Sequence, residues 1–437
     1  MATVDDLIST LQRSGVTQPS DLLRLLGISA PTLSRLVRKA GNRVVRLGST
    51  RGVRYAIPFE VSHVGTTLPL WSIDTNGFPT AFATVHFLQG SMYWLEPADA
   101  LRPRTRGHLY EGMPPFLADM APQGYLGRFF PERFPELDLP PRTIDWSDNH
   151  QLQAIALRGE DSVGHLIAGR DSMNRFLASE PQLTTRAEYP NRTRNLAHLA
   201  VGSSAAGEFP KFTAFNGKHH LLVKFTGGDG SPADLRWKDL LICEELAART
   251  LADVGFATPR TEAFTVANQL FLEIERFDRI GLRGRRGVLS LASLDDDLYG
   301  SRDSWHHAAA RLAADRLLSQ EDADKIHFLE AFARLIANTD RHFGNISFLW
   351  DPFAAANELR LSPVYDMLPM QFAPAPGGMV IEREYDLPTP TADLLDYWDA
   401  ARSSASQFWQ HAADDPRLSD GIRQLADSAA AKTKIQP

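Results

Sequence analysis

The stretch from Ala337 to Ser347, ANTDRHFGNIS, places the strongest constraint on how this chain can fold. It follows an apolar run with helical spacing, Phe328 to Ile336, and precedes a short apolar stretch, Ile346 to Trp350. The pattern predicts a polar loop held between two regular elements. The loop carries an Asp and an Asn five residues apart, Asp340 and Asn345. Their spacing makes this loop the first candidate for chemistry.

The same spacing occurs in the protein-kinase catalytic loop. There the Asp accepts the proton of the attacking hydroxyl, and the Asn holds a magnesium ion. Asp and Asn are also common loop residues, because their side chains hydrogen-bond the nearby backbone. The pair alone therefore favours an ordinary loop, and further motifs are needed to support a phosphate-binding site.

A small-residue stretch and an apolar strand supply two such motifs. Residues 201–212, VGSSAAGEFPKF, can bring backbone N–H groups close to phosphates, although no Walker A sequence is present. Lys224 lies within the apolar sequence LLVKF, where a lysine is costly unless it has an anionic partner. Glu244 and Glu245 lie on the helix expected over 235–254 and could be that partner. The alternative is an edge-strand lysine that points to water.

One acidic residue follows the candidate loop at a junction between a strand and a turn. The sequence LRLSPVYDMLPM places Asp366 there, 21 residues beyond Asn345. An acid at this point could be a second metal ligand, like the Asp of the kinase DFG motif. The alternative is an Asp that caps the following turn.

The N-terminal segment differs from the rest of the chain in charge. Residues 1–60 hold nine basic and four acidic residues, a net charge of +5. Because the whole chain has a net charge of −7, the remaining residues carry −12. Three amphipathic helices (3–14, 18–26 and 31–40) and a hairpin predict a winged helix-turn-helix that binds double-stranded DNA. The alternative is a basic face on a docking domain. The candidate DNA contacts are Thr32, Ser34, Arg35, Arg38 and Lys39 on the third helix and Arg46, Arg51 and Arg54 on the hairpin.

The rest of the chain is that of a globular protein, with 43% hydrophobic and 23% charged residues. Strands are expected over 63–96, a helical segment over 148–179, a loop over 180–199 and closing helices at the C-terminus. The only cysteine, Cys243, excludes internal disulfides. No apolar run is long enough for a bilayer and no secretory signal is recognised, so we expect a cytoplasmic protein without a membrane partner.

Taken in order, five motifs make the sequence resemble the HipA family of bacterial serine/threonine kinase toxins. They are SSAAGEFPK, the strand lysine, ERFDR, NTDRHFGN and YDMLP, and PPFLADMAPQGYLGR is similar to the family's N-terminal subdomain. The resemblance covers residues 65–400, and the extra N-terminal helix-turn-helix is typical of a branch in which this domain is fused to the kinase. It implies an α+β, two-lobed protein-kinase-like fold of the HipA type, preceded by a small winged helix-turn-helix domain.

The implied domains are a winged helix-turn-helix over 1–60, a strand-rich HipA-like subdomain over 61–145, a kinase N-lobe over 146–275 and a helical C-lobe over 276–437. The implied cofactors are ATP and Mg²⁺. The resemblance assigns these roles: Asp340 as catalytic base or orienter of the substrate hydroxyl, His342 near the γ-phosphate, Asn345 and Asp366 as metal ligands, Lys224 at the phosphates with Glu244 as its partner, Phe277, Tyr365 and the backbone near Glu275 at the adenine, and Ser204 or adjacent Ser203 as the autophosphorylated residue.

Two departures from the family pattern lie in the site itself. Phe209-Pro210 stands where the family often has Gln, and Phe343-Gly344 replaces a commoner small-Lys pair, which removes a possible phosphate-contacting cation. Neither removes an acid that catalysis needs.

The resemblance implies a growth-arresting kinase that is switched off when the loop serine is phosphorylated. Its substrate could be a translation component such as an aminoacyl-tRNA synthetase, and its further partners could be an antitoxin, DNA and a second copy in a homodimer. The alternative is a DNA-binding transcriptional regulator whose kinase-like body is an inactive ligand sensor.

Overall fold

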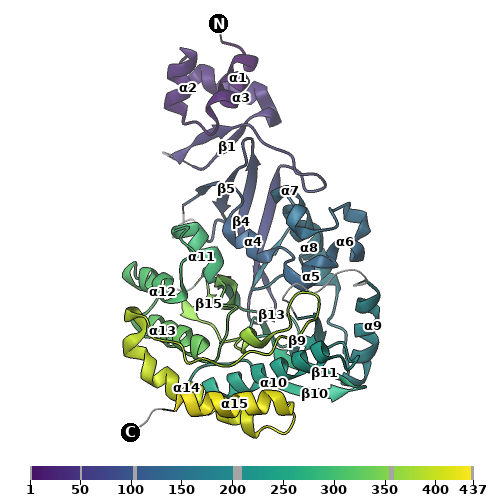
Figure 1. Ribbon diagram of the computed structural model, residues 1–437. Coiled ribbons are helices and arrows are strands. Elements are labelled where there is room, and N and C mark those ends of the chain that lie inside the picture. The colour runs from purple at the N-terminus through teal and green to yellow at the C-terminus, as the bar shows by residue number, and fades with distance from the viewer. Residues whose placement is uncertain (1, 50–51, 102–105, 200–208, 354–358, 435–437) are drawn as a thin grey trace. The chain divides into compact units, whose positions relative to one another are not determined.

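The computed structural model describes residues 2–49, 52–101, 106–199, 209–353 and 359–434, and it divides into two compact units. Unit 1 comprises residues 1–74, 78–122 and 134–179, and unit 2 comprises residues 75–77, 123–133 and 180–437. Figure 1 shows the chain as a ribbon.

Unit 1 begins with the three helices and the hairpin that the sequence predicts. They are α1 (Val4–Ser14), α2 (Pro19–Leu26), α3 (Ala30–Ala40), the 3-10 turn η1 (Gly41–Arg43) and the antiparallel strands β1 (Val45–Leu47) and β2 (Arg54–Ala56). Thr3 and Asp6 form a capping box at the start of α1. Leu7, Leu22 and Leu33, one from each helix, are at most 3% exposed and form a shared core. Burying each contributes about 1.5–3 kcal/mol.

An antiparallel sheet makes up the centre of unit 1. Its strand order is β6-β5-β4-β3-β7. The strands are β3 (Thr67–Ile73), β4 (Pro79–Leu88), β5 (Met92–Pro97), β6 (His108–Glu111) and β7 (Leu166–Ala168), and the associated helical elements are α4 (Pro115–Met120), η3 (Pro135–Leu137), η4 (Thr143–Asp145), α7 (Asp148–Arg158) and α8 (Arg170–Ala178). The strands expected over 63–96 are therefore present.

The helical segment expected over 148–179 forms two helices, α7 and α8, and the short strand β7, which was not predicted, separates them. Gly159 follows the last residue of α7, and Gly169 is the N-cap of α8. The φ of Gly169 is 83°, and a Cβ there would lie 2.4 Å from the carbonyl oxygen of Ala156. Only glycine permits this close approach of α8 to α7 in a left-handed conformation.

Unit 2 contains an antiparallel sheet with the order β10-β11-β9-β8. Its strands are β8 (Lys211–Phe215), β9 (His220–Phe225), β10 (Thr261–Val266) and β11 (Gln269–Glu275). The long helix α10 (Pro232–Asp253) shares a core with β10 and β11, in which Leu240, Leu246 and Leu272 are fully buried. The short helices α5 (Gly124–Arg128) and α6 (Phe130–Arg133) also belong to this unit.

The loop expected over 180–199 is wrong. The structure has the 3-10 turn η5 (Arg186–Glu188) and the helix α9 (Tyr189–Leu199). Thr185 and Glu188 form a capping box, which starts a helix even where no hydrophobic periodicity is visible. Tyr189 is fully buried, and its hydroxyl donates to Glu273 at 2.8 Å.

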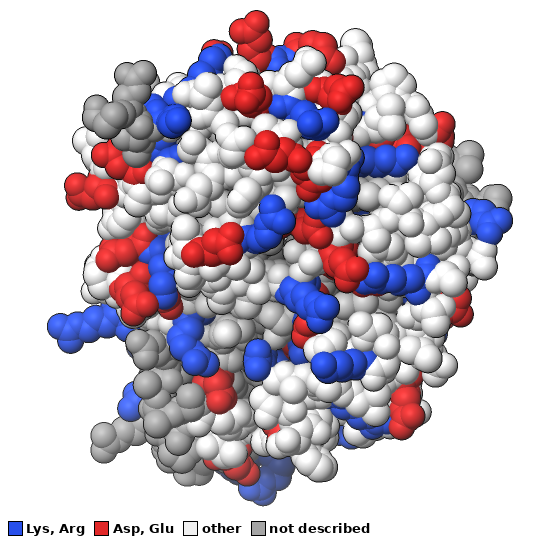
Figure 2. Space-filling view, turned by 90° about the horizontal axis from the view of Figure 1, so that it is seen from below, with Lys and Arg blue, Asp and Glu red and all other residues white. Residues whose placement is uncertain are grey.

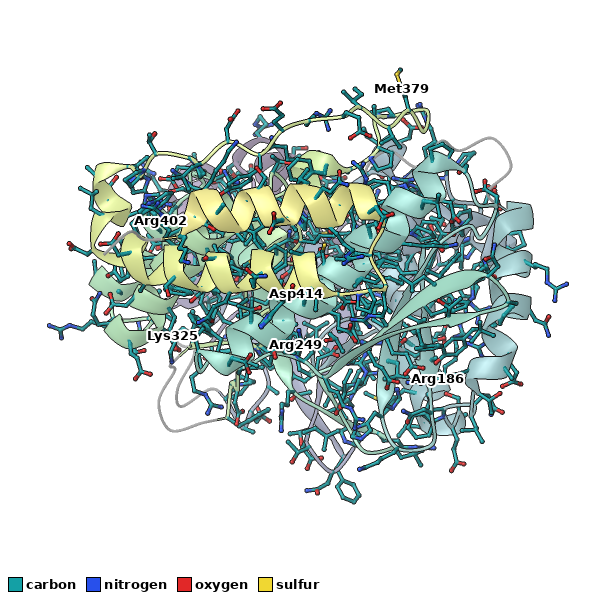
Figure 3. All side chains as sticks on the ribbon, turned by 60° about the horizontal axis from the view of Figure 1, so that its bottom comes forward. Arg186, Arg249, Lys325, Met379, Arg402 and Asp414 are labelled. Atoms are coloured by element: carbon teal, nitrogen blue, oxygen red, sulfur yellow. The ribbon has the colours of Figure 1, made fainter. Side chains whose placement is uncertain are left out.

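The remainder of unit 2 is mainly helical. Its strands are β12 (Arg279–Ile280), β13 (Gly284–Arg285), β14 (Gly287–Ser290), β15 (Ser347–Trp350) and β16 (Arg360–Leu361), and its helical elements are α11 (Leu291–Leu298), α12 (Trp305–Ala314), α13 (Gln320–Leu335), η6 (Phe343–Asn345), η7 (Met370–Phe372), η8 (Ala392–Leu394), α14 (Leu395–Asp414) and α15 (Asp420–Thr433). In Figure 3, α14 and α15 run side by side. Arg402 of α14 donates to the carbonyl oxygens of Thr433 and Lys432, at 2.9 and 3.2 Å, and so caps the end of α15.

Charges of both signs are interspersed over the face shown in Figure 2, without a large region of one sign. Many of the charges in unit 2 are paired, such as Arg417 with Glu245 and Asp415 at 2.6 and 2.7 Å. No helix in the described part of the chain has the length and hydropathy needed to cross a bilayer.

Candidate active site

A buried lysine is the centre of the candidate site. Lys224 lies on β9 between β11 and β8, opposite Leu272 and Lys211, and is 4% exposed. Its ammonium nitrogen lies 2.7 Å from each carboxylate oxygen of Glu244, which α10 presents at 3% exposure. The side chain therefore points into the protein and not into water.

A second carboxylate completes the environment of this lysine. Asp366 contacts the Lys224 ammonium through Oδ1, and its side chain keeps 30% of its exposure, against 4% for Glu244. The backbone at Asp366 has a φ of 61°, which is uncommon outside glycine and occurs often at functional sites. The ring of Phe209 also lies near Lys224, with 5.6 Å between the ammonium and the ring centre.

The three charges shift one another's pKa. Burial would lower the pKa of the Lys224 ammonium, but the carboxylates of Asp366 and Glu244 outweigh burial and raise it. Burial raises the pKa of Glu244, and Lys224 opposes this. Burial also works to raise the pKa of Asp366, but Lys224 and Lys211 lower it on balance. Lys224 is thus a cation and Asp366 an anion at neutral pH, and the charge on Glu244 depends on Lys224.

The loop with Asp340 and Asn345 is fixed by hydrogen bonds of its own. The Asn345 amide nitrogen donates to the backbone carbonyl of Asp340 at 2.8 Å, and Asn345 is 3% exposed. The Tyr365 hydroxyl donates to the carbonyl of Gly344 at 2.8 Å and lies 2.6 Å from the Ser347 hydroxyl. The Asp340 side chain remains partly exposed. The loop is therefore fixed by hydrogen bonds to its own backbone carbonyls.

Asn338, which the sequence reasoning missed, joins this loop to the segment that carries Asp366. Its side chain accepts from the backbone N–H of Asp340 at 3.0 Å and donates to the backbone carbonyl of Asp366 at 3.4 Å. The end of α13 places it there, because Ala337 takes a φ of 57° and the Asn338 N–H donates back to Ala333 at 2.8 Å.

Replacing Asn338 with Ala should therefore loosen both segments at once. We expect Asn338→Ala to lower the free energy of unfolding by about 1–3 kcal/mol, because buried partners lose their hydrogen bonds. Urea unfolding followed by circular dichroism measures the change. The exposed neighbour Thr339 gives the matched control, Thr339→Ala, which should stay within about 0.5 kcal/mol of the native chain. Equal stability of Asn338→Ala and the control would contradict the bridging role.

The other predicted site residues lie at different places in unit 2. The rings of Phe277 and Tyr365 are adjacent, with centres 5.8 Å apart. Glu275 ends β11 and accepts from the His219 ring nitrogen at 2.7 Å. The His342 ring is exposed, and its Nδ1 accepts from the Gly344 N–H at 3.1 Å. Ser203 and Ser204 lie outside the described residues.

The predicted DNA contacts belong to unit 1. On α3, Ser34, Arg35, Arg38 and Lys39 are exposed and Thr32 is half-buried, opposite the packed residues Leu33 and Ala40. On the ribbon, Arg46 is exposed and Arg54 is half-buried, and Arg51 lies outside the described residues. The described basic members of this set, on α3 and on the ribbon, are thus all at least partly exposed.

Comparison with known proteins identifies the class. The model of the HipA-like C-terminal domain matches residues 203–433, and the model of the YjjJ-like toxin middle domain matches residues 64–177. The chain belongs to the HipA-like toxin family, as its motifs predict. It is similar over nearly its whole length to Toxin YjjJ of Escherichia coli (strain K12), with 34% identity over 447 residues that cover 98% of this chain and 97% of the relative.

Comparison with a solved structure also identifies the fold as that of HipA. The chain matches the HipA toxin in the complex of HipA, HipB and operator DNA from Shewanella oneidensis MR-1, with a TM-score of 0.54 and 15% identity over 83% of this chain and 96% of that chain. The expected α+β fold of the HipA type is confirmed.

Proposed function

We propose that this chain is a protein serine/threonine kinase that uses ATP and Mg²⁺. The observation that carries the proposal is the buried Lys224 held between Glu244 and Asp366, with Asn338 joining Asp366 to the Asp340–Asn345 loop. Phosphoryl transfer needs positioned charges and little covalent participation by the protein, and this arrangement supplies positioned charges.

The donor set suits Mg²⁺, which prefers oxygen ligands. Asn345 commits its amide nitrogen to the carbonyl of Asp340, which leaves its amide oxygen for a metal. Asp366 would offer carboxylate oxygen, and its pKa is lowered, so it is ionised at neutral pH. Bound Mg²⁺ would neutralise charge on the phosphate oxygens during transfer.

In the proposed reaction Asp340 accepts the proton of a substrate serine or threonine hydroxyl. The hydroxyl oxygen bonds to the γ-phosphorus of ATP, the bond to the β-phosphate oxygen breaks, and ADP leaves. Lys224 contacts the nucleotide phosphates, with Glu244 orienting it, and His342 lies near the γ-phosphate. Phe277 and Tyr365 line the adenine pocket together with the backbone near Glu275.

Regulation and partners follow from the same family membership. We propose that Ser204, or its neighbour Ser203, is autophosphorylated and that the added charge switches the kinase off. The protein substrate would be a translation component such as an aminoacyl-tRNA synthetase. The HipA match is a complex with HipB and DNA, which supports an antitoxin-like partner and DNA contact here. A homodimer, a cytoplasmic location and the division at residues 60, 145 and 275 are part of this proposal.

Incubation with γ-labelled ATP and Mg²⁺ tests the kinase proposal. We expect label on the chain itself and on a protein in a bacterial lysate. A chain that binds ATP but transfers label to neither would overturn the proposal, and would favour a DNA-binding regulator with an inactive kinase-like body.

DNA binding by the N-terminal helices is tested separately. We expect Arg35→Ala/Arg38→Ala to weaken binding to the chain's own promoter DNA and to reduce the salt dependence of binding by about one counterion per lost phosphate contact. Fluorescence anisotropy over a salt series measures both quantities, and phosphoryl transfer should be unchanged. Arg24→Ala on α2, an exposed arginine paired with Asp21 at 3.0 Å, is the matched control. Equal promoter affinity of the double variant and the control would contradict the assignment of α3.

A further inference from the structure

Two adjacent histidines at the start of α12, neither of which has a role in the proposed kinase reaction, lie against an aspartate of η8. The Nε2 atom of His307 lies 3.4 Å from a carboxylate oxygen of Asp393, and the Nε2 atom of His306 lies 3.8 Å from the same oxygen. One ligand atom from each of the three residues falls within 4.8 Å of the others. The two histidines are neighbours in the sequence, and Asp393 follows them by almost ninety positions.

His306 is held as a metal-binding histidine is held. Its Nδ1 lies 2.7 Å from a carboxylate oxygen of Glu330 on α13, and its backbone N–H donates to the same oxygen at 3.0 Å. This contact favours the tautomer with the proton on Nδ1, which leaves the lone pair on Nε2. Arg334 contacts the other oxygen of Glu330 at 3.1 Å. The carboxylate is thus fixed and in turn fixes the ring.

The Nε2 atom of His306 is buried and has no hydrogen-bond partner among the residues that the structure describes. The side chain is 4% exposed and directs this atom toward Asp393 and His307. A buried acceptor without a partner is costly, and such an atom in a native protein requires an explanation. A ligand between the three residues would satisfy it.

We propose that His306, His307 and Asp393 bind a divalent transition-metal ion of the Zn²⁺ class. Zn²⁺ takes imidazole and carboxylate ligands at about 2.0–2.2 Å in a tetrahedron, which separates the ligand atoms by about 3.4 Å. The two separations to Asp393, 3.4 and 3.8 Å, are close to this value, and all three ligand atoms lie within 4.8 Å of one another. Mg²⁺ is the wrong ion here, because it prefers six oxygen ligands. Three protein ligands leave the fourth position for water or for another group.

The site is accessible, because His307 and Asp393 keep 50% and 58% of their side-chain exposure. The nearby charges also favour a cation. Asp303 lies 3.7 Å from Nδ1 of His307, and Glu330 lies behind His306. Arg311 contacts Asp303 at 2.7 Å and also contacts Asp295 at 3.0 Å. The positive charge of Arg311 is therefore shared between two carboxylates.

A metal here would act on the candidate active site through one residue. Trp305, which precedes His306, donates its indole N–H to the backbone carbonyl of His342 at 3.1 Å. Fixing the first turn of α12 to η8 would therefore fix the support of the Asp340–Asn345 loop. The ion would be a structural element of this part of unit 2, distinct from the Mg²⁺ of the proposed reaction.

The test uses the full chain without a histidine tag and two probes, Zn²⁺ in calorimetry and Co²⁺ in absorption spectroscopy. We expect one ion per chain and the visible absorption of tetrahedral Co²⁺. His307→Ala and Asp393→Ala change exposed side chains and should fold, and each should weaken Zn²⁺ affinity by at least about tenfold. Excess Zn²⁺ should raise the melting temperature of the native chain and not that of the double variant.

His108→Ala is the matched control, because His108 is an exposed histidine of unit 1. It should leave stoichiometry, affinity and the Co²⁺ spectrum unchanged. Zn²⁺ affinity that is equal in the native chain and in His307→Ala/Asp393→Ala would overturn the proposal. Absence of Co²⁺ absorption together with no effect of Zn²⁺ on the melting temperature would overturn it as well, and would leave a cluster of ion-paired histidines.

Discussion

Lys224→Met is expected to lower the free energy of unfolding at neutral pH by about 3–5 kcal/mol, the cost of leaving one buried charge without its partner. Methionine has a similar volume and fills the space along β9, so the loss comes from charge and not from a cavity. Glu244 contributes most of this loss, because it is 3% exposed and Lys224 contacts both of its oxygens at 2.7 Å. Asp366 is less affected, since its side chain keeps 30% exposure.

The loss of unfolding free energy in Lys224→Met should depend on pH in a defined direction. Burial raises the pKa of Glu244, and without Lys224 only the weaker effect of Lys211 opposes that shift. A carboxyl group whose folded-state pKa is raised stabilises the fold below its unfolded pKa, and this stability is lost as the pH rises through the folded value. In the native chain Lys224 lowers the pKa of Asp366, which adds stability above the unfolded value. The difference between the two proteins should therefore be small near pH 4 and grow toward pH 7.

Urea unfolding at several pH values measures this difference. In the Lys224→Met background, Glu244→Gln should recover much of the loss, because it removes the unpaired charge and keeps the shape. Lys218→Met is the matched control, because Lys218 is an exposed lysine in the turn before the same strand, and it should stay within about 0.5 kcal/mol. A Lys224→Met deficit that is equal at pH 4 and pH 7, or that Glu244→Gln does not reduce, would contradict the buried ion pair.

Local signals in the sequence account for most of the elements of the fold. The apolar run around Lys224 predicted a strand, and the amphipathic pattern in 31–40 predicted α3, on which Leu33 and Ala40 are buried. The structure differs from the expected elements in two places, where local chemistry overrides periodicity. The helix expected over 148–179 ends at Arg158, and Gly169 precedes a second helix after a backbone approach that periodicity does not register. The capping box of Thr185 and Glu188 starts another, in a segment too polar to show an apolar stripe.

Contacts between distant segments account for what was missed in the site. The sequence suggested a partner for Lys224 twenty positions away on the next helix, but gave no sign that Asp366, 142 positions away, contacts the same ammonium. Asn338 lies within the motif that was quoted for its Asp and Asn. Its bridging role depends on the left-handed turn at Ala337, which no residue preference indicates, since glycine is usual there. His306 and Asp393 meet only through the packing of α12 and η8.

These missed contacts share a physical cause. Polar groups that fix the geometry of a site do so across loops, and their spacing in sequence is set by the length of the elements between them. The residue types that bear chemistry can be recognised from the sequence, whereas the residues that orient them require the fold. Each of three side chains makes a hydrogen bond to the backbone of the candidate loop: Asn338 accepts from the Asp340 N–H at 3.0 Å, and Tyr365 and Trp305 donate to carbonyls at 2.8 and 3.1 Å.

Asp340→Asn is expected to reduce phosphoryl transfer by about 10²–10⁴-fold, the range for loss of a catalytic base. The amide has the shape of the carboxylate but cannot take the proton of the attacking hydroxyl. The loop should keep its structure, because Asn345 and Asn338 contact the backbone carbonyl and backbone N–H of Asp340, at 2.8 and 3.0 Å. The melting temperature should therefore change little.

Measuring the rate of phosphoryl transfer and the nucleotide affinity separately distinguishes a catalytic base from a residue that only supports the loop. Single-turnover transfer from labelled ATP should fall, whereas the affinity for a fluorescent ATP analogue with Mg²⁺ should stay within a few-fold, because Lys224, Glu244 and Asp366 are unchanged. Asp399→Asn, at an exposed aspartate of α14, is the matched control and should retain the native rate. Equal rates for Asp340→Asn and Asp399→Asn would show that Asp340 is not the base. A parallel loss of nucleotide affinity and melting temperature would instead assign it to the support of the loop.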